Sequence, residues 1–320
     1  MTRPNYVERD GQLIVRPPYL QSNAFLMGWL VPADKAALQR IVDQTLNHPA
    51  GGAVDYRVLF STVILTFADI ARVSSLDPVD SKKGFTPEGD VCVWVVLGAY
   101  EDGKLDRLVF FLPYIWVTSA IAVSIGREVF GFPKEYGWAS MPSAPHSTGP
   151  FWGDSEVIVH YSPTSPITRQ RLVEVSRDPA ASPVETTLEG VAGAAETLFK
   201  KLHEMEGDYE DAPEFDWAFL WNLLKDILGG HLPCVFLKQF RSATSPEAAS
   251  YQAIVEANAT IQDVSGVGLV VAPWELRFWQ YASHRLIDSL GVKPSSTLPL
   301  SMWVDFTFSM DLGRVVWKAP

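Results

Sequence analysis

The 320-residue chain is 47% hydrophobic and 20% charged, the composition of a folded protein with a sizeable core. Its 26 basic and 37 acidic side chains leave a formal charge of -11, which argues against nucleic acid or an anionic membrane as the main partner. Cys92 and Cys234 are the only cysteines. They favour a reducing, cytoplasmic compartment over a disulfide framework, and residues 1–13 lack the apolar stretch of a signal peptide.

Strands predominate among the elements that the apolar spacing predicts. Strands are expected at 23–31, 56–73, 90–100, 107–117, 156–162, 171–176, 233–240, 251–264, 275–279 and 300–317. Helices are expected at 32–46, 118–130, 182–203, 217–230 and 281–290. This order is not the regular alternation of a parallel doubly wound sheet. It predicts an α+β, mainly β fold in one domain over residues 1–320.

A helical insertion is predicted at about residues 181–230. Ser182 as N-cap, Pro183 at the first helical position and Glu185 two residues later form a capping box for the helix at 182–203. The acidic run at 204–216 lacks the spacing of a calcium loop and is interpreted as a solvated linker. The amphipathic helix at 217–230 closes on two glycines.

The run from Leu108 to Ile125 is uncharged and long enough to be a candidate membrane span. Pro113 interrupts it, and its first half is β-branched and aromatic. These features favour a buried strand followed by a short helix, so no membrane association is expected.

Several kinds of site are excluded by missing motifs. The chain has no phosphate-binding loop and no G-x-S-x-G elbow, and the glycines at Gly266 and Gly268 lack the third member of a dinucleotide fingerprint. The six histidines are scattered without metal-ligand spacing. We therefore expect no metal and no nucleotide cofactor.

The stretch "TSAIAVSIGREVFGFPKEYG", residues 118–137, places Lys134 on a stiff turn. Ser119 can cap the short helix, Gly131 can end it in a left-handed conformation, and Pro133 stops it. Phe130, Phe132, Pro133 and Tyr136 could form an apolar wall around the amine. A lysine is a nucleophile only when it is deprotonated, which requires desolvation or a nearby cation to lower its pKa. Local composition alone favours the alternative that Lys134 is an ordinary surface residue after a helix.

Residues 120–137, "AIAVSIGREVFGFPKEYG", resemble the signature of the acetoacetate decarboxylase family. Flanking segments resemble the family in the same order along most of the chain, except for about 143–230. The resemblance implies an antiparallel, cone-shaped closed β-barrel with short outer helices. It also implies that Lys134 forms a Schiff base with a keto acid inside that barrel.

The resemblance extends to further residues. Glu88 corresponds best to the family's acidic pocket residue, and Arg127 and Glu128 match its G-R-E element, with Glu128 as a candidate proton carrier. Phe132 supports the lysine. The family's substrate-directed arginine aligns near Asn23 or Ala24, and its second lysine aligns with Glu135. An inward-facing Glu135 would raise the pKa of Lys134, whereas an outward-facing one would leave the tuning to burial.

Decarboxylation of a β-keto acid through an iminium at Lys134 is the function that the resemblance implies. An aldolase, dehydratase or cyclase using the same lysine is the alternative, favoured by Glu135 and by the absent arginine. A barrel that binds a small ligand without turnover is the alternative of another class. The expected partner is a small keto acid or related carbonyl compound, with no organic cofactor, in a homo-oligomer.

Overall fold

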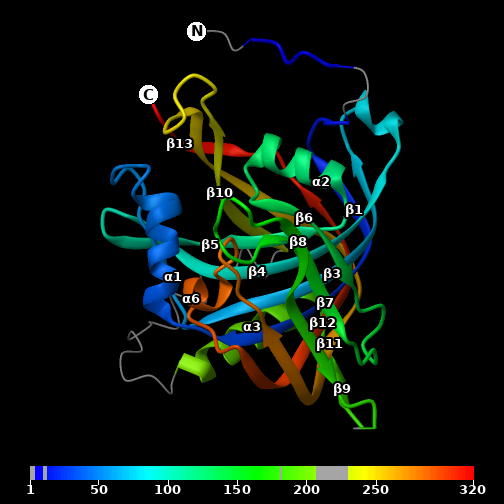
Figure 1. The fold of residues 1–320 in the computed structure, drawn as a ribbon. Coiled ribbons are helices and arrows are strands. Elements are labelled where there is room, and N and C mark those ends of the chain that lie inside the picture. Colours follow the sequence, from blue (N-terminus) through cyan, green and yellow to red (C-terminus); the bar gives the residue numbers. More distant parts are fainter. Residues whose placement is uncertain (1–3, 10–12, 181, 207–229) are drawn as a thin grey trace.

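The structure, a computed structural model, describes residues 4–9, 13–180, 182–206 and 230–320. It is mainly β, as predicted, and its strands belong to one sheet (Figure 1). The strands are β1 (Tyr19–Pro32), β2 (Tyr56–Val58), β3 (Thr62–Ser75), β4 (Thr86–Glu101), β5 (Lys104–Val117), β6 (Lys134–Ser140), β7 (Phe151–Ile158), β8 (Ile167–Arg177), β9 (Val184–Thr187), β10 (His231–Arg241), β11 (Ala249–Phe278), β12 (Ser295–Met310) and β13 (Arg314–Lys318). The helices are α1 (Lys35–Val42), α2 (Ala120–Ile125), α3 (Gly190–Glu206) and α6 (Leu286–Leu290). Shorter helical turns are η1 (Asp43–Asn47), η2 (Asp80–Lys83) and η3 (Gly126–Phe130).

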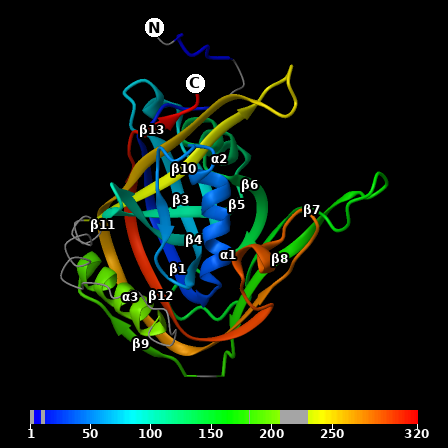
Figure 2. The ribbon, with the colours of Figure 1, turned by 90° about the vertical axis from the view of Figure 1, so that its left-hand side faces the viewer.

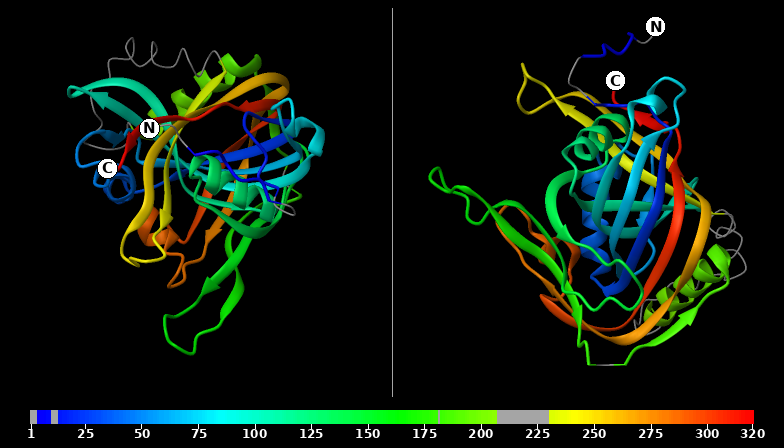
Figure 3. Two further views of the ribbon diagram at one scale, coloured as in Figure 1. Left: turned by 90° about the horizontal axis from the view of Figure 1, so that it is seen from above. Right: turned by 90° about the vertical axis from the view of Figure 1, so that its right-hand side faces the viewer.

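Hydrogen-bonded pairs close part of the sheet into a ring. The circuit runs through β1, β3, β4, β5, β10, β11 and β12, and returns to β1. Tyr19 at the start of β1 pairs with Met310 at the end of β12, so the ring joins distant parts of the chain. Figure 3 shows the ring from above, and α2 and α3 lie at opposite ends of it (Figures 1 and 2).

The prediction of an antiparallel sheet is wrong for two pairs of strands. β5 runs parallel to β10 and also parallel to β6. The β5–β6 pair is parallel because α2 and η3 form a crossover connection between the two strands, which a tight hairpin could not provide. This connection delivers Lys134 to the first position of β6.

The wall of the ring separates two apolar cores. Side chains alternate across each strand, so Met27 and Val31 of β1 face the outer core while Leu26 and Leu30 face the lumen. In the outer core, Trp29 and Trp274 pack edge to face at 5.2 Å, beneath elements that include α1 and α6. Figure 2 shows α1 lying across the outer face. The lumen therefore has apolar walls, and the outer core packs against the other face of the same strands.

The insertion differs from the prediction at its start. Val184–Thr187, predicted as the first turn of a helix capped by Ser182, form β9 instead and pair with β11. The helix begins at Gly190. β-branched residues favour the strand, and Gly268 lets the β9 backbone approach, since a Cβ there would lie 2.3 Å from the Thr186 carbonyl oxygen. Residues 217–229 of the predicted helix at 217–230, and most of the acidic linker at 204–216, lie outside the described residues.

Two further predictions concern segment boundaries. The strands expected at 251–264 and 275–279 are parts of one strand, β11, whose register shifts let it bend along the ring. The uncharged run from Leu108 to Ile125 forms the end of β5 and helix α2, as predicted. Within the described part of the chain, the helices are too short or too polar to span a membrane.

Candidate active site

The turn that carries Lys134 forms as the sequence predicts. The Ser119 side chain accepts a hydrogen bond from the Ala122 N–H at 3.3 Å and so caps α2. Gly131 ends η3 with φ of 93°, a conformation that favours glycine. A Cβ at this position would also lie 2.5 Å from the Lys238 backbone. Lys134 follows at the start of strand β6, so its backbone is held rigidly.

The Lys134 side chain points into the ring. Only 11% of it is exposed, and its Nζ donates a hydrogen bond to Glu88 Oε1 in a salt bridge. Gly126 makes room for the stem, because a Cβ there would lie 2.6 Å from Lys134 Cδ. The Phe132 ring lies 5.4 Å from Nζ, within the range of a cation–π contact. The amine is thus enclosed, paired and held by packing.

A second carboxyl, Asp90, completes the charged cluster. Burial, followed by the charge of Glu88, raises the pKa of Asp90 well above its ordinary value, which favours the neutral carboxylic acid. The protonated Asp90 side chain hydrogen-bonds to Glu88. Burial alone would lower the pKa of Lys134, but Glu88 and Asp90 outweigh it and raise the pKa of the amine. In the ligand-free protein the two carboxyls therefore oppose the lowered pKa that a nucleophilic lysine requires.

These side chains line a cavity of about 150 Å³ within the ring. Its polar residues are Gln21, Thr66, Thr86, Glu88, Asp90, Cys92 and Lys134, and its remaining wall is largely apolar. Burial raises the pKa of the Cys92 thiol well above its ordinary value, so this cysteine is a neutral thiol. The cavity, here called the lysine chamber, can hold a small carbonyl compound beside the amine.

Glu135 faces away from the lysine chamber. Successive residues of a strand point to opposite faces, so the inward Lys134 requires an outward Glu135. The Glu135 carboxylate accepts hydrogen bonds from Trp116 Nε1 at 3.2 Å and from His284 Nε2 at 2.8 Å. The sequence had left the direction of Glu135 open, and the structure shows that it does not charge the chamber.

Three other predicted site residues lie outside the lysine chamber. Arg127 is exposed and donates from Nη1 to the Lys134 carbonyl oxygen at 3.3 Å, so it supports the backbone. Glu128 is partly buried and hydrogen-bonds with the Tyr6 side chain. Asn23 sits exposed at a register shift of β1 with φ of 53°, and Gln21 lines the chamber in its place. The irregular register turns Asn23 outward.

The predicted apolar wall is present in part. Phe130 and Phe132 line the chamber, whereas Tyr136 is 41% exposed and Pro133 lines a different cavity. Asp90 and Cys92 were missed by the sequence analysis. The signal was available, because residues 88, 90 and 92 alternate along one strand and so share a face with Glu88.

No known family model matches the amino-acid sequence, and neither does any curated protein. Solved structures do match in three dimensions. Acetoacetate decarboxylase from Legionella pneumophila subsp. pneumophila str. Philadelphia 1 aligns with a TM-score of 0.59 at 14% identity, covering 99% of this chain and 93% of that one.

Related enzymes match to a similar degree. The enduracididine biosynthesis enzyme MppR complexed with pyruvate aligns with a TM-score of 0.56 at 15% identity, covering 96% of this chain and 93% of that one. An acetoacetate decarboxylase-like enzyme from Sphingomonas wittichii RW1 aligns with a TM-score of 0.54 at 12% identity, covering 96% of both chains. The chain therefore has the fold of acetoacetate decarboxylase and of acetoacetate decarboxylase-like enzymes.

Proposed function

We propose that the protein is a Schiff-base-forming lyase in which the Lys134 amine attacks the carbonyl group of a keto acid. The observation that carries the proposal is an enclosed lysine in contact with Glu88, with a second carboxyl, Asp90, beside them. Lysine is almost never buried unless it is paired, and a cluster of perturbed titratable groups in a cavity is typical of an active site. Decarboxylation of a β-keto acid is the first candidate reaction.

Imine formation begins with a proton transfer. The amine is protonated in the free protein, and Glu88 can take that proton because its carboxylate already contacts Nζ. The neutral amine then attacks the carbonyl carbon. Glu88 returns its proton to the oxygen of the carbinolamine, which leaves as water, and the product is an iminium at Lys134.

The iminium then serves as the electron sink. The electron pair of the bond to the carboxylate moves into the iminium, carbon dioxide leaves, and an enamine remains. Asp90, neutral and close to Glu88, can protonate the enamine carbon. Water hydrolyses the resulting iminium and releases the ketone. The net reaction consumes one proton and releases one carbon dioxide.

An aldol-type reaction at the same lysine is the second candidate. Among the described residues, Lys134 is the only cationic side chain that lines the chamber, so no arginine holds a substrate carboxylate there. The Glu88 carboxylate also disfavours a second anion nearby. A neutral aldehyde or ketone needs no arginine partner and is not repelled by Glu88. MppR has been solved with the condensation product of pyruvate and imidazole 4-carboxaldehyde, which supports such chemistry on this fold.

For the whole protein we propose a single domain whose ring is a cone-shaped closed barrel, assembled as a homo-oligomer in the cytoplasm. Two buried free cysteines support the reducing compartment. Light scattering after size exclusion measures the oligomeric state, and a monomer would contradict this part of the proposal.

Borohydride trapping tests the proposed nucleophile. The protein is incubated with acetoacetate, pyruvate and longer β-keto acids and reduced, and the mass of the peptide that contains Lys134 is measured. We expect an adduct on Lys134 in the wild type. Lys134→Arg keeps a cation beside Glu88 but has no amine that forms an imine, so it should give none.

Lys35→Ala is the matched control, because the Lys35 Nζ donates to the Leu59 carbonyl oxygen and does not line the lysine chamber. This variant should trap as the wild type does. If the folded wild type forms no adduct with any of these substrates, both proposed reactions are refuted. The hypothesis that remains is a barrel that binds a small ligand without turnover. Carbon dioxide release that depends on Lys134 then separates decarboxylation from aldol chemistry.

A further inference from the structure

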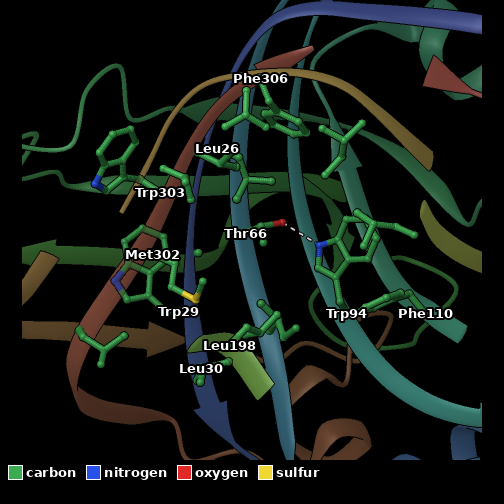
Figure 4. A pocket seen from close by; sticks show the side chains of 18 residues that line it. Leu26, Trp29, Leu30, Thr66, Trp94, Phe110, Leu198, Met302, Trp303 and Phe306 are labelled. Atoms are coloured by element: carbon green, nitrogen blue, oxygen red, sulfur yellow. Dashed lines mark hydrogen bonds between the residues drawn. The ribbon is translucent and has the colours of Figure 1, made fainter. Parts of the chain in front are cut away.

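A second cavity of about 200 Å³ lies in the ring beyond the lysine chamber (Figure 4). We call it the apolar chamber. Its walls are almost entirely hydrocarbon and aromatic, and they come from all seven strands of the ring. The mechanism proposed above uses no residue found in this chamber alone, so the space has no role in the chemistry at Lys134.

The two chambers are neighbours along the axis of the ring. They share six lining residues: Leu26, Thr66, Trp94, Leu232, Ile261 and Phe306. On β4, Glu88 and Asp90 face the lysine chamber and Trp94 lies at the shared boundary. A molecule bound at Lys134 can therefore extend past Trp94 into the apolar chamber.

The surface that the described residues present to the apolar chamber is almost entirely apolar. The indole N–H groups of Trp29 and Trp303, two residues of its wall, are buried and have no hydrogen-bond partner among those residues. The Trp94 Nε1 donates to the Thr66 Oγ1 at 2.8 Å, so the two polar side chains at the boundary are paired with each other (Figure 4). A polar substituent placed beside this pair would lose hydrogen bonds to water that the apolar walls do not replace. The chamber also exceeds a known engineered cavity of about 150 Å³ lined by Leu, Ile and Phe, which stays dry and binds benzene.

The insertion closes the far end. Leu198 of α3 lines the chamber, and Leu202, one turn later, is fully buried in the same core. Gly28 on β1 keeps the lumen open, because a Cβ there would lie 3.2 Å from the Thr66 methyl group. The chamber is thus bounded by α3 at one end and by the lysine chamber at the other.

We propose that the substrate carries an aryl group or a chain of several carbons next to its reactive carbonyl, and that the apolar chamber binds this group. The assignment of the carbonyl end rests on the proposed function of Lys134. The apolar end rests on the lining and volume of the second chamber. A four-carbon acid such as acetoacetate would leave the apolar chamber unfilled.

Chain length provides the first test. The kcat/KM of the wild type is measured with straight-chain β-keto acids of four to ten carbons and with benzoylacetate. Each methylene that enters the chamber should raise kcat/KM about three- to fourfold, until the chamber is full. Equal or better turnover of the four-carbon acid would overturn the proposal.

Binding without chemistry provides the second test and separates the two proposals. Methyl ketones of increasing length are titrated into Lys134→Arg by calorimetry, and affinity should rise with length by a similar factor. Val304→Trp fills the apolar chamber and should remove the dependence on length, whereas Val315→Trp, at an exposed position on β13, should keep it.

The outcomes are distinct. Length-dependent binding without any borohydride adduct in the wild type would refute the Schiff base and keep the chamber assignment. A borohydride adduct without any dependence of binding on chain length would support the Schiff base and refute the chamber assignment. If Val304→Trp does not fold, the wild-type series and the ketone titrations still decide the question.

Discussion

At the scale of single residues, the site is defined by how one amine and two carboxyls share their protons. Glu88 contacts the Lys134 ammonium and lies beside Asp90, whose raised pKa favours its neutral form, so this form leaves the cluster with little net charge. This arrangement reduces the cost of burying charge. In the proposed reaction, the amine is therefore stored in protonated form and becomes a nucleophile after it transfers a proton to Glu88.

Asp90 should make stability depend on pH. Its raised pKa lets the folded protein hold a proton that the unfolded chain loses above about pH 4. This contribution is complete at lower pH and is lost as pH rises through the folded-state pKa, by up to about 1.4 kcal/mol per pH unit. We expect Asp90→Asn to have a flatter free energy of unfolding between pH 5 and 7 in urea titrations. Asp102→Asn, at an exposed turn, is the control, and equal slopes for Asp90→Asn and the wild type would contradict the prediction.

Glu135 should be unable to tune Lys134 by its charge. Glu135→Lys places a second lysine directly after Lys134, but the new cation would face away from the chamber. We expect the pH at which trapping of Lys134 begins to stay unchanged. Loss of the contacts with Trp116 and His284 should lower the free energy of unfolding by about 1 kcal/mol. A shift of trapping by one pH unit or more toward acid would show that residue 135 reaches the amine.

At the scale of elements, capping residues in the sequence correctly predicted helix α2 but gave a wrong prediction for the start of the insertion. Ser119 and Gly131 bracket the helix as expected, because capping depends on neighbours in sequence. The segment from Ser182 to Glu185 carries an equally good capping box, yet Val184 to Thr187 pair with β11. The sequence does not reveal that a strand edge is available there. Tertiary context decided between two locally acceptable structures.

The cap of α2 should be worth a measurable part of the stability. Ser119→Ala removes the side-chain acceptor for the Ala122 N–H and should lower the free energy of unfolding by about 1 kcal/mol. Ser124→Ala is the matched control, because Ser124 is exposed on the same helix and contacts the Ala120 carbonyl. Denaturant titration compares the two, and equal losses would show that the cap contributes nothing specific.

At the scale of the whole molecule, the sequence predicted a β-rich fold and a reactive lysine but not the space around it. Alternation along β4 could have placed Asp90 beside Glu88, since that periodicity is local. The apolar chamber could not be found in this way. Its walls include Leu26, Phe110, Val264 and Met302, which no local pattern relates. Volume is a property of the assembled ring.

Closure of the ring also has a consequence for how the protein comes into being. The pairing of Tyr19 with Met310 joins strands β1 and β12, which are separated by most of the given sequence. Neither chamber can exist before that seam forms, because β1 and β12 both line them. Such non-local pairing slows folding, because the chain loses conformational entropy on closing the loop before the contacts between the strands offset that loss. A nascent chain therefore cannot form either chamber before β12 has been synthesised and has paired with β1.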